Sequence, residues 1–215
     1  ATRKLHDIVR YRLTQTAVSA DDAERLQAYG SPMKIHVKID TGMRRLGESF
    51  GETERILSMF RPSRLRVTGT YSHLAAADDL GAAGSVFTRR QFERFDRVVR
   101  QIRAAGHDPG LLHIQSSYGM LNYDGTGMDL VRPGIALYGL LSRENDRTWS
   151  NVDLRPVLSL KANVTQVKEV PAGESVGYGG QFTVSRNSVI ASLSIGYADG
   201  IPRNIAELGG SVLIR

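Results

Sequence analysis

The stretch Met33-Lys34-Ile35-His36-Val37-Lys38-Ile39-Asp40-Thr41-Gly42 joins an alternating, β-branched run to a polar turn. Alternation of apolar and polar residues is typical of a strand with two different faces, so residues 33–39 are predicted to form a strand. The polar residues and the glycine that follow predict a loop at its carboxyl end. In parallel α/β folds, the loops at the carboxyl ends of the strands build the active site. The turn at 40–42 is therefore the first place where we expect chemistry.

Strand and helix patterns alternate on both sides of this stretch. Strands are expected at 13–18, 65–71, 111–114 and 130–131, and helices at 6–11, 21–29, 51–60 and 85–105. Polar loops again follow three of these strands, at 72–73, 115–117 and 132–134. Ser19 is expected to cap the helix at 21–29, whose first turn is acidic. Alternating strands and helices imply parallel βα units, and four successive polar loops at strand ends favour a barrel, so residues 1–140 are predicted to be part of a TIM (β/α)8 barrel.

The character of the sequence changes after residue 139. Residues 141–153 are polar, carry the only tryptophan, and are expected to be a linker. From residue 154 to residue 215 the helical signals vanish, and β-rich runs lie at 157–170, 188–195 and 211–214. The expected fold class is therefore α/β, with part of a TIM barrel followed by the start of an all-β domain.

Composition excludes several classes of protein. The chain of 215 residues has no cysteine, which rules out disulfides and thiolate metal sites within it and suits a cytoplasmic location. It has a net charge of +6. The basic residues are scattered rather than interleaved with aromatic ones, so no nucleic-acid partner is expected. No histidine pair has ligand spacing with a nearby carboxylate, so no metal is expected. No stretch is apolar over the length that a bilayer needs.

Five segments, in one order along the chain, resemble the alanine racemase family. The segment Lys38-Ile39-Asp40-Thr41-Gly42-Met43-Arg44-Arg45-Leu46-Gly47 resembles its K-x-D-T-G-M-x-R-L-G segment. Residues 71–75, 131–139, 175–179 and 195–200 resemble its T-H-x-A, R-P-G-I-x-x-Y-G, Y-G and I-G-Y-A-D-G segments. Each segment alone is typical of an ordinary turn or loop start. Their shared order over residues 38–200 makes the resemblance specific.

The resemblance implies an isomerase that uses pyridoxal 5'-phosphate to interconvert L- and D-alanine, or L- and D-serine, for peptidoglycan precursors. It also implies a homodimer with shared active sites and a small amino acid as substrate. Such a reaction needs two acid/base groups on opposite sides of the substrate. Tyr178 matches the family's tyrosine base, and His73 and Arg132 match the network that poises it, with Arg132 at the ring nitrogen of the cofactor. Arg45 matches an arginine beside the cofactor's phenolic oxygen, with a catalytic, cofactor-binding and substrate-binding role.

The remaining matched positions complete the expected site. Ser117, Gly134 and Ile135 match ligands of the cofactor's phosphate, a task that suits a hydroxyl, backbone N–H groups and a glycine. Lys38 matches a lysine that is often carbamylated in the family. Tyr197 matches a tyrosine at the substrate entry.

Three departures from the family pattern matter. The lysine that anchors the cofactor, in a K-A-N-A-Y-G-H-G segment, has no equivalent here, and the C-terminal G-R-x-x-M-D-Q segment is also missing. We therefore expect a piece of a longer protein that does not racemise by itself. Ser116 stands where the family usually has asparagine. With Ser116 and residues 177–182, the chain resembles the serine/alanine racemases of vancomycin resistance. In those proteins a membrane-embedded region precedes the racemase part. Contact with a membrane is expected only if such an upstream segment exists.

Two other functions stay open at this stage. One is a decarboxylase of basic amino acids on the same fold, although such enzymes favour a carboxylate at the position of Arg132. The other is a non-catalytic protein that binds pyridoxal phosphate or has a regulatory role. The missing lysine is the best argument for this alternative. Four further histidines are expected to have no catalytic role. His113 is expected to be structural, and His6, His36 and His107 are expected at the surface or in packing.

Overall fold

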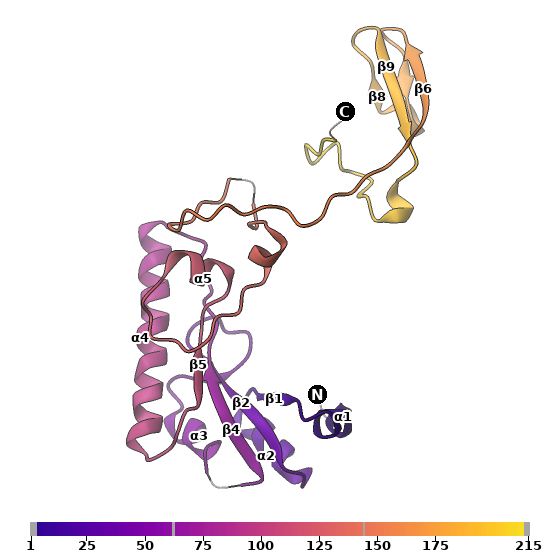
Figure 1. Cartoon of the computed structure of the whole chain (residues 1–215). Helices are drawn as coiled ribbons and strands as arrows, with labels where there is room; N and C mark the ends of the chain where they lie inside the picture. The colour runs from indigo at the N-terminus through magenta and orange to yellow at the C-terminus, as the bar shows by residue number, and fades with distance from the viewer. Residues whose placement is uncertain (1–3, 62, 144, 213–215) are drawn as a thin grey trace. The chain divides into compact units, whose positions relative to one another are not determined.

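A computed structural model describes residues 4–61, 63–143 and 145–212 (Figure 1). The chain divides into two compact units, Ala1–Val157 and Leu158–Arg215. Residues 141–153, the expected linker, lie within the first of these units. Along the described parts of the chain, no helix combines the length and the apolar character needed to cross a membrane.

The first unit is built on a parallel sheet. Its strands are ordered β1-β2-β4-β5, and the short β3 pairs with β2. The bounds are β1 Thr14–Ala17, β2 Met33–Asp40, β3 Glu48–Ser49, β4 Leu65–Tyr71 and β5 Leu111–His113. All the ladders in this sheet are parallel. The predicted strands at 13–18, 33–39, 65–71 and 111–114 are thus confirmed.

Helices separate the strands. They are α1 Leu5–Arg10, α2 Ala20–Ala28, α3 Thr53–Ser58, α4 Ala82–Ala104, α5 Ser117–Asn122 and the 3-10 helix η2 Ile135–Tyr138. The four predicted helices are confirmed, and α4 begins three residues before the predicted start at 85. Ser19 caps α2 as predicted, because its Oγ accepts a hydrogen bond of 3.1 Å from the backbone N–H of Asp22.

The predicted strand at 130–131 is wrong. The backbone N–H groups of Asp129 and Leu130 both donate to the carbonyl of Leu112, at 2.8 and 3.2 Å. The N–H of Arg132 then reaches the carbonyl of Gln115 at 3.0 Å. A parallel ladder spaces its hydrogen bonds evenly along the partner strand, and two donors on one carbonyl break that spacing. The segment therefore lies along β5 without extending the sheet.

The two faces of β2 have different surroundings. Ile35, Val37 and Ile39 are fully buried and belong to one core cluster with Phe95 and Ile102 of α4. Figure 1 shows α4 running alongside the sheet. Because successive side chains of a strand point to opposite faces, residues 36, 38 and 40 lie on the other face, where the polar groups gather.

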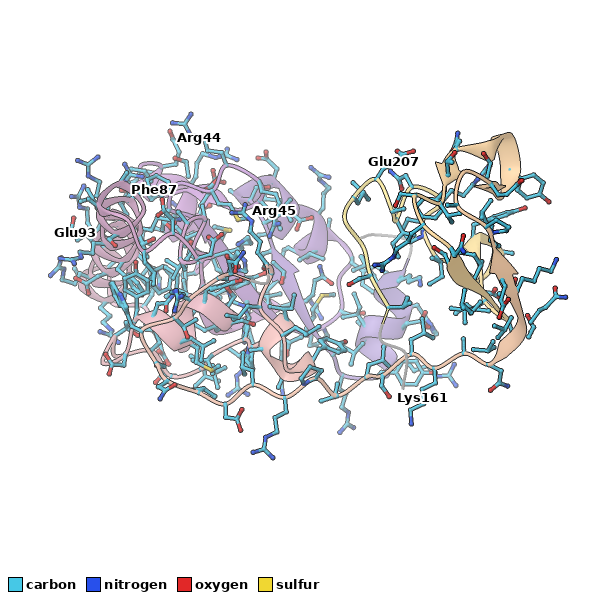
Figure 2. The ribbon with its side chains drawn as sticks, turned by 90° about the horizontal axis from the view of Figure 1, so that it is seen from above. Arg44, Arg45, Phe87, Glu93, Lys161 and Glu207 are labelled. Atoms are coloured by element: carbon cyan, nitrogen blue, oxygen red, sulfur yellow. The ribbon has the colours of Figure 1, made fainter. Side chains whose placement is uncertain are left out.

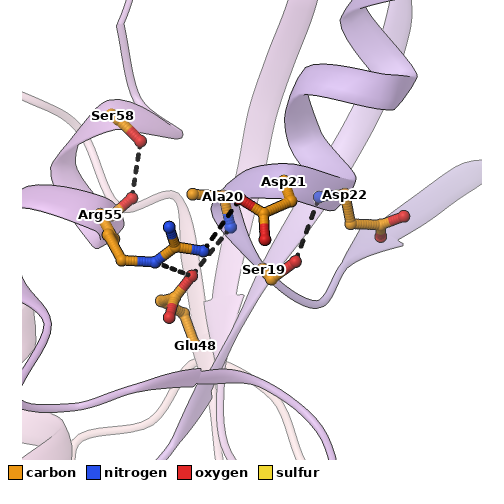
Figure 3. Close-up of polar contacts among 7 residues, drawn as sticks. All are labelled: Ser19, Ala20, Asp21, Asp22, Glu48, Arg55 and Ser58. Carbon is orange, nitrogen blue, oxygen red and sulfur yellow. Dashed lines mark hydrogen bonds and ion pairs between the residues drawn. The ribbon is translucent and has the colours of Figure 1, made fainter.

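A buried carboxylate ties β3 to two helices (Figure 3). Glu48 Oε2 accepts from the backbone N–H of Ala20 at 2.9 Å, at the start of α2, and from Arg55 Nε of α3 at 3.2 Å. Arg55 also donates to Asp21 at 3.1 Å. A negative charge at a helix amino end is favoured by the helix dipole, so this contact fixes the chain that follows the polar turn at 40–42.

The second unit has only β-strands and short turns among its described residues. Strands β6 Val164–Val170 and β9 Ser188–Leu193 are antiparallel, and β7 Ser175–Val176 pairs antiparallel with β8 Phe182–Thr183. The 3-10 turns are η3 Tyr178–Gly180 and η4 Tyr197–Asp199. The expected β-rich run at 211–214 shows no strand at 211–212, and 213–214 lie outside the described residues.

Candidate active site

Polar and aromatic side chains form two layers on the inner face of the parallel sheet. Cross-strand pairing defines each layer, because paired residues share a face. The deeper layer contains Thr16, His36, Gly69 and Leu111, and the next layer towards the carboxyl ends contains Lys38, Tyr71 and His113. The loops after β2 and β4 add Arg45 and His73. This is the edge at which the sequence predicts the active site.

Arg132 lies between two imidazoles. Its NH1 contacts His113 Nδ1, and its NH2 lies 3.1 Å from His73 Nδ1. NH2 also donates to the carbonyl oxygen of Ser72 at 2.7 Å. A guanidinium can only donate, so both imidazoles accept through Nδ1. When neutral, each ring therefore carries its proton on Nε2.

Both imidazoles are held in the neutral form. Burial, followed by the charge of Arg132, lowers the pKa of His73 to about 4, and Lys38 and Arg45 add to the effect. The same two leading causes lower the pKa of His113 to about 4. At pH 7 both rings are therefore neutral, as their acceptance of hydrogen bonds from Arg132 requires.

Tyr71 lies at the centre of the cluster. Its ring stacks on His113 at 4.7 Å between centroids, Lys38 Nζ lies 4.7 Å from the ring centroid, and Arg132 Cζ lies 5.1 Å from it. Its hydroxyl is 3.0 Å from Thr16 Oγ1. The negative face of an aromatic ring attracts cations, so Tyr71 keeps two positive groups close together. Sequence reasoning missed this residue, although its place two positions before His73 is the signal that would have found it.

Lys38 is nearly buried, with 6% of its surface exposed. Burial, followed by the charges of Arg132 and Arg45, lowers its pKa to about 8, although Asp40 acts in the opposite direction. Lys38 lines a pocket of about 420 Å³ with Arg45, Tyr71 and His73. Figure 2 shows the neighbouring Arg44 projecting away from the ribbon of the first unit. Arg45, by contrast, contributes to the pocket wall.

Ser117 and the start of η2 form a small anion cradle. The backbone N–H groups of Gly134 and Ala136 converge on Ser117 Oγ, at 2.8 and 3.2 Å. A Cβ at Gly134 would have only that Oγ within 4 Å, at 3.9 Å, so the approach to the backbone is open. A hydroxyl and helix-start N–H groups aimed at one point suit a phosphate. The predicted residues Ser117, Gly134 and Ile135 therefore lie together at the start of η2, where the N–H groups of Gly134 and Ala136 donate to Ser117 Oγ.

Two predicted site residues belong to the second unit. Tyr178 is 94% exposed and starts η3, between Gly177 and Gly179, whose φ angles are 80° and 69°. Such positive φ angles favour glycine. In this turn the phenol of Tyr178 is exposed to solvent. Tyr197 starts η4, and its ring lies 5.5 Å from Arg203 Cζ.

Two histidines that were expected outside the active-site chemistry have contacts with its residues. His113 was expected to be structural, and it also contacts Arg132 directly. His36 was expected at the surface or in packing; it is half-buried, and its Nδ1 lies 2.9 Å from His113 Nε2. Among residues 4–61, 63–143 and 145–212, no group of three His, Cys, Asp or Glu side chains is placed to hold a metal ion.

Comparison with known proteins links both units to one family. The family description "Alanine racemase, N-terminal domain" matches residues 1–142, and "Alanine racemase, C-terminal domain" matches residues 157–215. The serine/alanine racemase of Enterococcus gallinarum is 38% identical over 205 residues, which are 95% of this chain and 29% of that protein. The alanine racemase of Carboxydothermus hydrogenoformans is 37% identical, over 96% of this chain and 56% of that protein. The chain thus spans about a third to about half of these relatives.

Solved structures agree with the fold. Alanine racemase from Streptomyces coelicolor is 34% identical, with a TM-score of 0.81 over 92% of this chain and 53% of that one. Alanine racemase from E. faecalis has a TM-score of 0.83 and 25% identity, over 95% of this chain and 55% of that one. The enzyme from Bartonella henselae, described with covalently bound pyridoxal phosphate, has a TM-score of 0.77 and 27% identity, over 95% of this chain and 55% of that one. The predicted fold class, part of a TIM barrel followed by part of a β domain, is confirmed.

Proposed function

We propose that this chain, which belongs to the alanine racemase family, is part of an enzyme that racemises alanine or serine with pyridoxal 5'-phosphate. One observation carries the proposal: Arg132 lies between two neutral imidazoles at the carboxyl edge of the sheet. A guanidinium at this place faces the cofactor's ring nitrogen without giving it a proton. A decarboxylase of basic amino acids on this fold favours a carboxylate there, so Arg132 argues against that alternative.

The chain offers a partner for each polar end of the cofactor. The hydroxyl of Ser117 and the backbone N–H groups of Gly134 and Ile135 would hold the phosphate, in place of the present contact between the Gly134 N–H and Ser117 Oγ. Arg132 would contact the ring nitrogen, and Arg45 would contact the phenolic oxygen. When bound, pyridoxal phosphate delocalises the electrons that remain after the α-proton leaves. Because a guanidinium has no proton to give, Arg132 would leave the ring nitrogen unprotonated, which would weaken this electron sink and disfavour side reactions such as transamination.

His73 connects Arg132 to the proton-transferring phenol. Its Nδ1 accepts from Arg132, so its Nε2–H is free to donate to a phenol oxygen. We assign that oxygen to Tyr178 of the partner subunit in a homodimer, an assignment supported by the exposure of Tyr178. A hydrogen bond to the deprotonated oxygen stabilises it, so Tyr178 removes or returns the α-proton from one side. The opposite side needs a lysine that lies outside this chain.

Lys38 sets the charge beside Arg45. With a pKa of about 8, roughly a tenth of its amine is neutral at pH 7. The nitrogen of a neutral amine bonds to the carbon of carbon dioxide and releases one proton to water, which leaves a carbamate with a negative charge. We assign this modification to Lys38, where the carbamate oxygens hold the guanidinium of Arg45 in place for cofactor and substrate. Tyr197 lines the entry for the amino acid.

The similarity of 38% to a serine/alanine racemase supports serine beside alanine as a substrate. Supply of D-amino acids for peptidoglycan, in the cytoplasm, is the role that accords with this chemistry. The alternative of a non-catalytic cofactor-binding protein predicts binding of pyridoxal phosphate without formation of a D-amino acid.

The test replaces Tyr178 with Phe in the complete protein. We expect racemisation starting from one enantiomer to be lost, while pyridoxal phosphate remains bound, because the phenyl ring keeps its shape and loses only the acid/base oxygen. The matched control is Tyr29→Phe, an exposed tyrosine of the first unit. Unchanged rates in both directions would contradict the role of Tyr178. Absence of any D-amino acid product from the unsubstituted protein would contradict the proposed function itself.

A further inference from the structure

A third imidazole lies behind the pair that flanks Arg132. His36 Nδ1 is 2.9 Å from His113 Nε2, and the two ring centroids are 5.1 Å apart. His36 belongs to the deeper layer of the sheet and His113 to the layer above it. His36 does not line the pocket formed by Lys38, Arg45, Tyr71 and His73. Its hydrogen bond therefore acts on Arg132 only through His113.

The direction of the hydrogen bonds in this row follows from Arg132. Because the guanidinium donates to His113 Nδ1, the proton of neutral His113 is on Nε2 and points at His36. His36 Nδ1 must then be an acceptor. Burial, followed by the charge of Arg132, lowers the pKa of His36 and so favours the neutral ring, whose Nδ1 can accept when its proton is on Nε2. If His36 instead donated through Nδ1, His113 would carry its proton on Nδ1 and two donors would face each other at Arg132.

The backbone makes room for this diagonal contact. His36 reaches β5 by crossing β4 at Gly69, its cross-strand neighbour. A Cβ at Gly69 would lie 2.7 Å from Cε1 and Nε2 of the His36 ring, closer than real contacts allow. The register of β2 and β4 shifts just before this pair, so that Thr68 is skipped and Gly69 faces His36. A bulge often re-aims a side chain, and here it places the one residue without a Cβ under the ring.

We propose that His36 is a positioning residue for Arg132: by accepting the Nε2 proton of His113, it keeps His113 Nδ1 available to hold the guanidinium. The inference rests on the proposed function, in which Arg132 faces the ring nitrogen of pyridoxal phosphate. Loss of the acceptor at position 36 lets His113 switch tautomer, and Arg132 then loses one of its two imidazole partners.

The experiment compares two probes, pyridoxal 5'-phosphate and its 1-deaza analogue, in which C–H replaces the ring nitrogen. The complete protein is freed of cofactor, and the affinity for each probe is measured by titration. His36→Phe keeps a ring but lacks the acceptor, whereas His36→Asn keeps an acceptor oxygen near the place of Nδ1. His107→Phe is the control, because His107 stacks on Phe60 away from this row. If circular dichroism shows that His36→Phe is misfolded, the smaller His36→Leu replaces it.

We expect the unsubstituted protein, His36→Asn and His107→Phe to bind pyridoxal phosphate more tightly than the deaza analogue. In His36→Phe this preference should fall about tenfold, the size of one hydrogen bond to a charged group. If His36 has only a structural role, His36→Phe weakens the binding of both probes equally and leaves the preference unchanged. That result overturns the inference about His36 and leaves the proposed function standing. Equal binding of both probes by the unsubstituted protein overturns the ring-nitrogen contact of the proposed function together with the inference. Nitrogen-15 spectra of His113 in the cofactor-free protein provide a second reading: the Nε2–H form should dominate except in His36→Phe.

Discussion

Acid should destabilise the first unit well before its carboxylates titrate. His73 and His113 each have a pKa lowered to about 4, against 6.5 for a free imidazole. Below pH 6.5 these two histidines therefore bind protons in the unfolded chain but stay neutral in the folded chain until the pH approaches 4. Stability rises with pH wherever the unfolded state binds more protons. The contribution of each histidine is thus present above pH 6.5 and is lost as the pH falls towards about 4.

The size of the effect follows from the two pKa values. Between pH 7 and pH 5, a group that titrates near 6.5 when unfolded and near 4 when folded costs about 2 kcal/mol of unfolding free energy. His73 and His113 share Arg132 as a cause of their shifts. Removing one histidine therefore changes the environment of the other, and about 4 kcal/mol is an upper bound for the pair.

The assay is urea unfolding of the complete, cofactor-free protein at pH 7 and pH 5, followed by circular dichroism. His113→Asn keeps an acceptor for Arg132 and removes one titrating group, so its loss of stability between the two pH values should be about 2 kcal/mol smaller than that of the unsubstituted protein. The control His6→Asn removes an imidazole that is 77% exposed and should change nothing. If His113→Asn and the unsubstituted protein lose the same stability between pH 7 and pH 5, the reasoning about this cluster is refuted.

Two further predictions concern the cofactor site. Ser117→Ala should weaken binding of pyridoxal phosphate by about tenfold in a titration, because one hydroxyl donor to the phosphate is lost while the N–H groups of Gly134 and Ile135 remain; unchanged affinity would place the phosphate elsewhere. Carbon-13 bicarbonate should give the complete protein a carbamate resonance at neutral pH, since the pKa of Lys38 is lowered to about 8, and the resonance should be absent from Lys38→Arg; a resonance that survives this substitution would assign the carbamate to another amine.

Strands β1, β2, β4 and β5 could be predicted from sequence because each has a local signal, whereas the two-residue β3 at Glu48–Ser49 has none and was not predicted. The alternation at 33–39 and the acidic first turn after Ser19 act within a few residues, and the structure follows both. The segment around Leu130 has the apolar residues of a strand but no strand pairing. The N–H groups of Leu130 and Asp129 both donate to the carbonyl of Leu112. This is a tertiary contact that no local sequence pattern predicts.

The same division between local and tertiary signals runs through the candidate site. His73 and Ser117 come shortly after the strands β4 and β5, so their position marks them as candidates, whereas Arg132 follows no strand; the resemblance supplies the roles of all three. Tyr71 and His113 lie within strands, where an apolar or aromatic residue needs no functional explanation. Their importance depends on contacts between strands more than 40 residues apart in sequence, such as the ring stacking of Tyr71 on His113.

His36 shows why such a residue escapes sequence reasoning. Its two-residue spacing from Lys38 predicts that both side chains share the inner face of the sheet, and that prediction agrees with the register. The hydrogen bond to His113, however, needs a skipped Thr68, a glycine at 69 and a ring that crosses one strand to reach the next. None of these conditions changes the hydrophobic pattern. A histidine that acts only through another histidine therefore looks like ordinary packing until the tautomers are worked out from the fixed donors of Arg132.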